Sequence, residues 1–354
     1  MKRFLKQIIV LFSIVILIFS LVKSIIPYYW WSNQFSDKVI YLEKHNNYNT
    51  FFIGSSRVYY HINPLVFDSI VNNNFLDKIR SFNLGSDGMY LPENYYLLEN
   101  LIKSEQLLNA KYIFVELQNE PNRFRINRDE YWQNTRDLVF LSKIILEKDK
   151  GSIISQYFFI ANIVKSYIIS FFDLDQFKSY ILKQHSFNSN LLGKYQNGYL
   201  ALNGKLEMIM NIKGNIEGNR NIFLKDSLYL KKLNKEREIK LLIETSEKVS
   251  VTHLKRIQYL IDLAKNQNIQ LIFFTSPMLT NPSLINLYKK LPKENRIALN
   301  QSPDFSNLLK KDNLYDIHHF NDKGARLYTE IFANEFTKFI KINIGLNNEK
   351  KKID

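Results

Sequence analysis

The 354-residue sequence contains no cysteine. This absence excludes disulfide bonds, thiolate metal sites, a cysteine nucleophile and a lipid-modified N-terminal cysteine. It is compatible with an oxidising compartment but does not indicate one. Glycine and proline are also few, with 11 and 8 residues, and no Pro/Gly/Ser-rich linker or internal repeat divides the chain. The hydrophobic fraction of 45% is sufficient for one large domain or two small ones.

Acidic residues are in the minority, since 34 Asp and Glu stand against 48 Lys and Arg, which gives a net charge of +14. A basic surface favours anionic partners such as membrane faces, acidic glycans or nucleic acid. The basic residues are spread along the chain, however, and form no basic helix or nucleic-acid-binding motif. We therefore interpret them as a solvated, lysine-rich surface and expect no nucleic-acid partner.

The N-terminus has the pattern of a membrane anchor. Three basic residues among the first six precede an apolar run over residues 8–22, and an aromatic cluster follows at residues 28–31. Extending the run to residues 5–26 gives the length of about 20 residues that a spanning helix needs. Positive charge before the apolar core predicts that the N-terminus stays in the cytoplasm, and aromatic residues are typical of a membrane–water interface.

A cleaved signal peptide is the alternative interpretation of this segment. The residues after the apolar run are large, so they do not form the small-residue motif of a cleavage site. We therefore expect residues 1–32 to be a retained signal-anchor that crosses the membrane once. Under either interpretation, the chain from about residue 33 onward is expected outside the cytoplasm, in the periplasm or on the outer face of the inner membrane.

Apolar runs and helical spacing alternate along much of the remaining chain. Four short apolar runs predict buried strands, and three segments have apolar residues at helical spacing. The strands are expected at residues 48–53, 78–84, 111–117 and 269–275, and the helices at 92–108, 251–266 and 322–340. This alternation predicts an α/β fold with a central parallel sheet and helices on both faces.

The alternation defines one domain over residues 33–345, but it is lost between residues 131 and 248. We interpret that stretch as a mainly helical insertion or cap over the sheet. The last residues, 346–354, are expected to be a basic, disordered tail. In parallel sheets, ligands bind beyond the carboxyl ends of the strands. Polar residues at those ends are therefore the candidates for function.

The first candidate follows the first predicted strand, where Gly54 permits a tight turn and Ser55 and Ser56 come next. A serine at the start of a helical segment is close to free backbone N–H groups, which can stabilise an oxyanion. An ordinary N-capping serine pair is the alternative. The Gly-x-Ser-x-Gly turn of α/β-hydrolases does not fit, because Val58 occupies the position of its second glycine.

The second candidate lies just before the last predicted helix, where Asp316 precedes His319 by three residues. A carboxylate at that spacing can bind one ring nitrogen of the histidine and leave the other to accept a proton from a serine. A plain surface turn with Asn321 as the N-cap of the next helix is one alternative. A metal site that uses His318 beside His319 is another, but no third ligand occurs nearby.

Two further residues follow predicted strands. Gly85 comes after the second strand and would let a backbone N–H approach a substrate oxygen closely. Asn119 comes after the third strand, and its side-chain amide can donate a hydrogen bond to an oxyanion. Each residue alone is ordinary for a strand end, and only the combination of these residues indicates an active site.

Together these blocks resemble the SGNH/GDSL hydrolase superfamily, which has a Gly-Asp-Ser, a later Gly, a Gly-x-Asn-Asp and an Asp-x-x-His in this order. Here Gly54-Ser55-Ser56 matches the first block with Ser55 in place of Asp, and Gly85 matches the second. Asn119 matches the third, in which Leu117 replaces the Gly and Glu120 the last Asp. The fourth block is matched by Asp316 and His319, with the usual extension completed by Asn321 and Gly324.

The resemblance implies a flavodoxin-like three-layer sandwich of the SGNH type. It implies Ser56 as nucleophile, His319 as base and Asp316 as the group that orients it. The oxyanion hole would consist of the N–H groups of Ser56 and Gly85 and the side chain of Asn119. No metal or organic cofactor is implied.

With its anchor, the chain is similar to a bacterial branch that includes alginate O-acetylation proteins and the lipoteichoic-acid D-alanylation protein. That likeness extends to residues 275–278, Thr-Ser-Pro-Met. It implies an esterase or O-acyltransferase that acts on acyl esters of a cell-surface glycan, beside a membrane-bound O-acyltransferase. The first alternative is an inactive accessory protein that binds a glycan or that acyltransferase. The second is an adhesive or structural envelope protein.

Overall fold

The computed structural model describes residues 2–25, 33–75, 77–104, 107, 109–118, 135–148, 153–172, 187–202, 215–225, 232, 235, 249–278, 282–299 and 305–350. The chain divides into two compact units. The first, called the anchor unit here, comprises Met1–Ser36 and Asn122–Phe187; the second, the sheet unit, comprises Asp37–Pro121 and Asn188–Asp354. The sheet and every candidate residue that the structure describes belong to the sheet unit.

Four strands form one parallel sheet in the order β2-β1-β3-β4. They are β1 (Thr50–Ile53), β2 (Ser81–Asn83), β3 (Tyr112–Glu116) and β4 (Gln270–Phe274), so all four predicted strands are confirmed, each shorter than its apolar run. Their residues are almost all buried. Burial on both faces is why these strands are continuous apolar runs and not alternating patterns.

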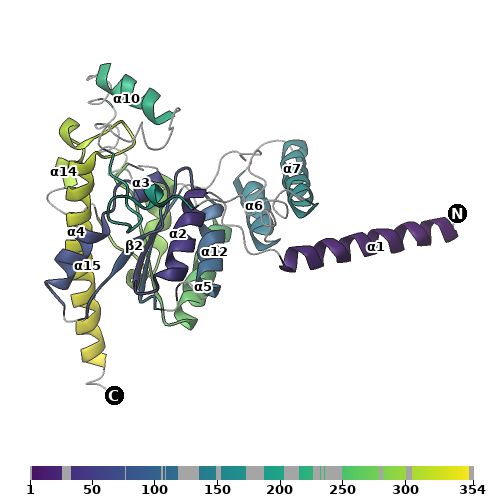
Figure 1. Ribbon diagram of the computed structural model, residues 1–354, viewed down its shortest axis with the longest axis horizontal. Coiled ribbons are helices and arrows are strands. Elements are labelled where there is room, and N and C mark those ends of the chain that lie inside the picture. Colours follow the sequence, from purple (N-terminus) through teal and green to yellow (C-terminus); the bar gives the residue numbers. More distant parts are fainter. Residues whose placement is uncertain are drawn as a thin grey trace. The chain divides into compact units, whose positions relative to one another are not determined.

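Helices cover both faces of the sheet (Figure 1). On one face α4 (Pro64–Asn72) packs against α15 (Asp322–Lys350), and on the other α5 (Glu93–Lys103) packs against α12 (Val251–Asn266). Each of the three predicted helices is present, and α12 has the predicted bounds. The α/β class with a central parallel sheet is therefore confirmed.

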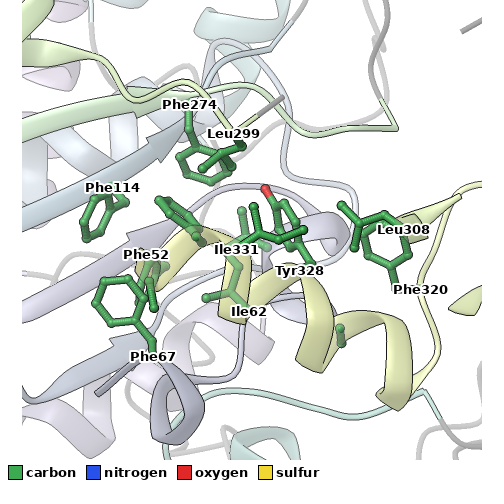
Figure 2. Packing of buried hydrophobic residues seen from close by; sticks show 14 of the residues in the cluster. Phe52, Ile62, Phe67, Phe114, Phe274, Leu299, Leu308, Phe320, Tyr328 and Ile331 are labelled. Carbon is green, nitrogen blue, oxygen red and sulfur yellow. The ribbon is translucent and has the colours of Figure 1, made fainter. Parts of the chain in front are cut away.

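Phenylalanine side chains fill the layer between the sheet and α15. The rings of Phe52 on β1 and Phe114 on β3 are stacked with 5.0 Å between their centroids, and Phe332 of α15 meets both rings edge-on. Phe67 of α4 joins them from the side, as Figure 2 shows. This cluster fixes α4 and α15 against the strands whose ends carry the candidate site.

Helix α15 begins where the sequence predicts, because the side chain of Asn321 accepts a hydrogen bond of 3.0 Å from the N–H of Gly324. Its C-terminal end differs from the prediction. The helix continues to Lys350, whereas residues from 346 onward were expected to be disordered. The segment after residue 340 contains no proline, the residue that most strongly breaks a helix. Residues 351–354 lie outside the described part of the chain.

The predicted insertion over residues 131–248 contains helices and a mainly non-helical segment, residues 187–202, where it is described, and it does not belong to one unit. Helices α6 (Thr135–Lys148) and α7 (Ile153–Phe172) belong to the anchor unit, and α10 (Asn215–Lys225) to the sheet unit. The segment 188–202 also returns to the sheet unit, where the carbonyl of Asn197 accepts the N–H of Asn83. Strand β2 is at the edge of the sheet, and this bond satisfies a donor that would otherwise lack a partner.

The N-terminal helix α1 (Lys2–Ile25) carries the predicted anchor. It is the one helix among the described residues that is long and apolar enough to cross a membrane, and none of its apolar segment Lys2–Val22 is buried against protein. The predicted signal-anchor therefore forms a helix of suitable length and composition. The side of the membrane on which the sheet unit lies stays a prediction.

We expect Phe114→Ala to lower the free energy of unfolding by about 3–5 kcal/mol, because the ring is fully buried and its loss leaves a cavity among four aromatic neighbours. Urea unfolding followed by circular dichroism measures the change. The control is Leu65→Ala on α4, where the side chain is 46% exposed and about 0.5 kcal/mol or less is expected. Equal effects of the two substitutions would contradict the packing described here.

Candidate active site

Ser56 lies on a tight turn at the carboxyl end of β1. Ser55 is the N-cap of the short helix α3 (Ser56–Tyr59), and its hydroxyl accepts the N–H of Arg57. A side chain at Gly54 would lie 2.4 Å from Val58 and 2.7 Å from Glu116, so only glycine fits. Ser56 is the first residue of α3, where a backbone N–H has no carbonyl partner within the helix. Its side chain is partly exposed.

The structure brings together Ser56, His319 and Asp316. Ser56 and His319 are 263 residues apart along the chain, and Asp316 and His319 are three residues apart. The hydroxyl of Ser56 is 2.9 Å from Nε2 of His319. The other ring nitrogen, Nδ1, is 3.0 and 3.1 Å from the two oxygens of Asp316. An ionised carboxylate can only accept, so Nδ1 carries the proton and Nε2 accepts from Ser56. This is the arrangement that activates a serine for nucleophilic attack.

The carboxylate of Asp316 is fully buried. Burial alone would raise its pKa, but the hydrogen bond and charge of His319, together with the N–H of His318, outweigh burial and lower the pKa. One of its oxygens accepts the backbone N–H groups of His318 and His319, at 2.6 and 2.8 Å. Asp316 therefore stays ionised at neutral pH and fixes both the turn and the imidazole ring.

The turn that carries His319 is held by its neighbours on both sides. The N–H of Tyr315 donates to the carbonyl of His319 at 2.9 Å, and Phe320 donates its N–H to Nε2 of His61 at 3.0 Å. Burial holds the pKa of His61 well below its usual range, and the positive charges of His319 and Arg57 act in the same direction. His61 is thus a neutral acceptor behind the candidate base.

A side of the His319 ring is covered by Tyr60. The two rings meet edge-to-face with 5.7 Å between centroids. The hydroxyl of Tyr60 donates to the carboxylate of Asp87, and burial raises the pKa of Tyr60 well above its usual range. Tyr60 therefore remains a neutral donor that restricts the orientation of the imidazole ring.

Glu116, the last residue of β3, organises the serine turn. One carboxylate oxygen accepts both the N–H and the hydroxyl of Ser55, at 2.8 and 2.7 Å. The other accepts Nε of Arg57 at 2.9 Å. Glu116 thus binds the residue on each side of Ser56 and leaves the hydroxyl of Ser56 to His319.

The charge of Glu116 is held by these partners. Burial would raise its pKa, but the Arg57 guanidinium and the hydrogen bonds from Arg57 and Ser55 outweigh burial and lower the pKa. The carboxylate is fully buried, and the Arg57 side chain is only 12% exposed. Buried carboxylates of this kind are stable only with such a set of donors.

Two further residues, Gly85 and Asn119, were predicted to form the oxyanion hole with Ser56. The N–H of Gly85 donates to the side-chain oxygen of Asn83 at 2.8 Å, which competes with the predicted role of Gly85. A side chain at Gly85 would lie 2.4 Å from the backbone nitrogen of Tyr59, so this glycine allows α3 to pack closely. Asn119 lies outside the described residues. The oxyanion roles of Ser56, Gly85 and Asn119 stay predictions.

His318 precedes His319, and two adjacent histidines raise the alternative of a metal site. Within the described part of the chain, no group of three or more His, Asp or Glu side chains is placed to hold a metal ion. Both ring nitrogens of His319 already face Ser56 and Asp316. The alternative in which His319 is a metal ligand therefore gains no support.

The sequence predicted roles for Ser56, Asp316 and His319, whereas Glu116 and His61 were not predicted. Glu116 had a signal: it is the one charged residue in the apolar run Tyr112–Leu117. A carboxylate inside a buried strand needs specific partners. His61 had no comparable signal, because its role depends on the approach of Phe320 from the far end of the chain.

Comparison with known proteins gives little further information. A family model that carries no functional description matches residues 224–341, and no curated protein matches the chain. The matched segment includes α12, β4 and the turn with Asp316 and His319, but not Ser56 or Glu116. It is too short a part of the chain to define its family.

We expect Asp316→Asn to reduce the rate at which a fluorophosphonate labels Ser56 by about 10³- to 10⁴-fold, because the amide cannot hold Nδ1–H of His319 in the productive tautomer.

The same substitution tests how the stability of the protein depends on pH. Because the pKa of Asp316 is lower in the folded than in the unfolded protein, its ionised carboxylate stabilises the fold at pH values above the unfolded-state pKa of about 3.9. This contribution is lost as the pH falls. The wild-type unfolding free energy should therefore fall more steeply below pH ~4 than that of Asp316→Asn. Parallel curves would contradict the lowered pKa of Asp316.

We expect Glu116→Gln to slow labelling of Ser56 by about 10²-fold, because displacement of a nucleophile by about 1 Å has effects of that size. The substitution keeps the side-chain volume but leaves Arg57 without its counter-charge, at a cost on the order of 3 kcal/mol. The control is Glu330→Gln in the exposed Arg326–Glu330 pair, where about 0–1 kcal/mol and an unchanged labelling rate are expected. An unchanged labelling rate in Glu116→Gln would show that Glu116 does not position Ser56.

Proposed function

We propose that this chain is a membrane-anchored serine hydrolase or O-acyltransferase of the SGNH/GDSL type that acts on acyl esters outside the cytoplasm. The observation that carries the proposal is the hydrogen-bonded series Ser56–His319–Asp316, in which each distance is about 3 Å. An ordinary surface turn does not require a hydroxyl, an imidazole and a buried carboxylate from distant segments to be hydrogen-bonded in series.

The fold supports the same proposal. The strand order β2-β1-β3-β4 corresponds to the beginning of the flavodoxin-like order, in which ligands bind beyond the carboxyl ends of the strands. Ser56 follows β1 and Glu116 ends β3, which are adjacent in the sheet. The SGNH-type sandwich is proposed on this basis.

In the proposed reaction, Ser56 attacks the carbonyl carbon of an acyl ester while Nε2 of His319 takes the hydroxyl proton. The tetrahedral oxyanion is stabilised by the N–H of Ser56, with Asn119 and Gly85 as further candidate donors. His319 then donates the proton to the departing alcohol, which leaves an acyl group on Ser56. Water or a sugar hydroxyl, deprotonated by His319, then attacks the acyl carbonyl carbon. The bond from that carbon to Oγ of Ser56 breaks, and His319 returns the proton to Oγ, which restores the serine.

The substrate is proposed to be an acyl ester, with acetyl as the first candidate, of a cell-surface glycan or polymer. The partner is proposed to be a membrane-bound O-acyltransferase. Both follow from the resemblance in sequence and from α1, whose basic flank precedes its apolar segment. An accessory protein with an unused Ser–His pair is the second candidate function, and the occupied N–H of Gly85 favours it.

The test is labelling of the full-length, detergent-solubilised protein with a fluorophosphonate probe. We expect labelling of the wild type, none of Ser56→Ala, and a loss on the order of 10⁴-fold in His319→Ala, because the serine then lacks its base. The matched control is Ser69→Ala, an exposed serine on α4 that should label as the wild type does. A folded wild type that is not labelled would overturn the hydrolase proposal in favour of the accessory one.

A further inference from the structure

Helix α7 of the anchor unit exposes a face made mostly of large apolar side chains. These residues, called the apolar α7 face, are Ile153, Ile154, Tyr157, Phe158, Val164 and Ile168. Their exposed fractions reach 80% at Ile154 and 70% at Tyr157. Contiguous exposed apolar surface of this kind marks an interaction site.

The six residues form a single stripe. At 3.6 residues per turn, their positions fall within an arc of about 140° around the helix axis, which also holds the exposed Ala161 and Lys165. Helix α6 packs against α7, and its buried residues Phe140 and Ile144, one turn apart, belong to the protein interior of this unit. Helix α7 thus packs with α6 within the anchor unit while the apolar α7 face stays exposed.

The composition of α7 suits a lipid environment. Its sequence from Ile153 to Phe172 contains no acidic residue and one basic residue, Lys165. A carboxylate would have to be desolvated on entering a bilayer, at high cost. A lysine has a long apolar stem and can extend its ammonium group to the lipid headgroups.

A contact between α7 and α1 indicates that the environment of the apolar α7 face is the lipid bilayer. The rings of Phe172, at the end of α7, and Phe19, within the apolar segment of α1, meet edge-to-face with 4.8 Å between centroids. Helix α1 is the described helix fit to cross a membrane. Where α1 enters the bilayer, the end of α7 enters with it.

We propose that α7 lies in the interface of the lipid bilayer beside α1, with the apolar α7 face toward the acyl chains. An amphipathic helix in this position buries its apolar side by roughly 5–10 Å below the headgroups. The anchor unit then holds the membrane through two elements, a spanning helix and an interfacial one. The proposal makes no use of the serine site, and it rests on the entry of α1 into the bilayer.

The absence of native cysteine makes this testable with single labels on the full chain. Nitroxides are attached to Ile154→Cys and Phe158→Cys on the apolar α7 face, to Leu11→Cys on α1 and to Leu65→Cys on α4. All four side chains are exposed, so folding should tolerate the changes, and circular dichroism checks it. The protein is placed in phospholipid nanodiscs, and accessibility to oxygen and to a water-soluble nickel chelate is measured by power saturation.

We expect the labels at Ile154 and Phe158 to behave as the label at Leu11 does, with loss of nickel accessibility and gain of oxygen accessibility. The label at Leu65 should show the reverse. Nickel accessibility at both α7 positions equal to that at Leu65, with Leu11 protected, would overturn the proposal. Dipolar broadening at the α7 positions would assign the face to a second copy of the chain and would also overturn it. A water-accessible Leu11 would remove the premise, and the proposal with it, without bearing on the serine site.

Discussion

The hydrogen bonds accepted by the carboxylate of Glu116 are the constraint on which the candidate site depends. They hold Ser55 and Arg57, the two neighbours of Ser56, at the end of β3. In a water-excluded environment such bonds are strong, and a donor left without its partner is costly. Ser56 is thus held through its neighbours, and its own hydroxyl remains free to donate to His319.

The parallel sheet supplies the framework for this interaction. Strands β1 and β3 are paired in register, with Ile53 opposite Val115, so the residues that follow β1 come directly beside Glu116. The imidazole arrives from the other end of the chain on the turn before α15. The aromatic cluster of Phe52, Phe114 and Phe332 fixes that helix against the same two strands. The geometry of the candidate site therefore depends on the packing of the core.

The anchor unit follows different physical rules. In the sheet unit, large apolar side chains are mostly buried, whereas most apolar side chains of α1 and all those of the apolar α7 face are exposed. Apolar side chains exposed to water are unfavourable, but in a lipid environment the same side chains contact acyl chains and this free-energy cost is absent. We therefore propose that the anchor unit attaches the protein to the membrane and that the sheet unit carries the candidate active site.

Local sequence was sufficient for several features. The four strands were predicted because each is a short apolar run, and α12 was predicted with its bounds because its apolar residues recur at helical spacing. The start of α15 was predicted from Asn321, whose capping bond closes within three residues. The return of residues 188–202 to the edge of β2 was missed, since pairing of a strand edge with a distant loop leaves no local periodicity.

By itself, the sequence determined the α/β alternation, the apolar anchor and the pairing of Asp316 with His319, because these arise within a few residues. Only the tertiary structure decided that Ser56 reaches His319, that Glu116 holds the serine turn and that the N–H of Gly85 is already bonded. Those contacts join segments that are distant along the chain or depend on side-chain orientation. They form only when the packed core fixes the strands and α15 in one arrangement.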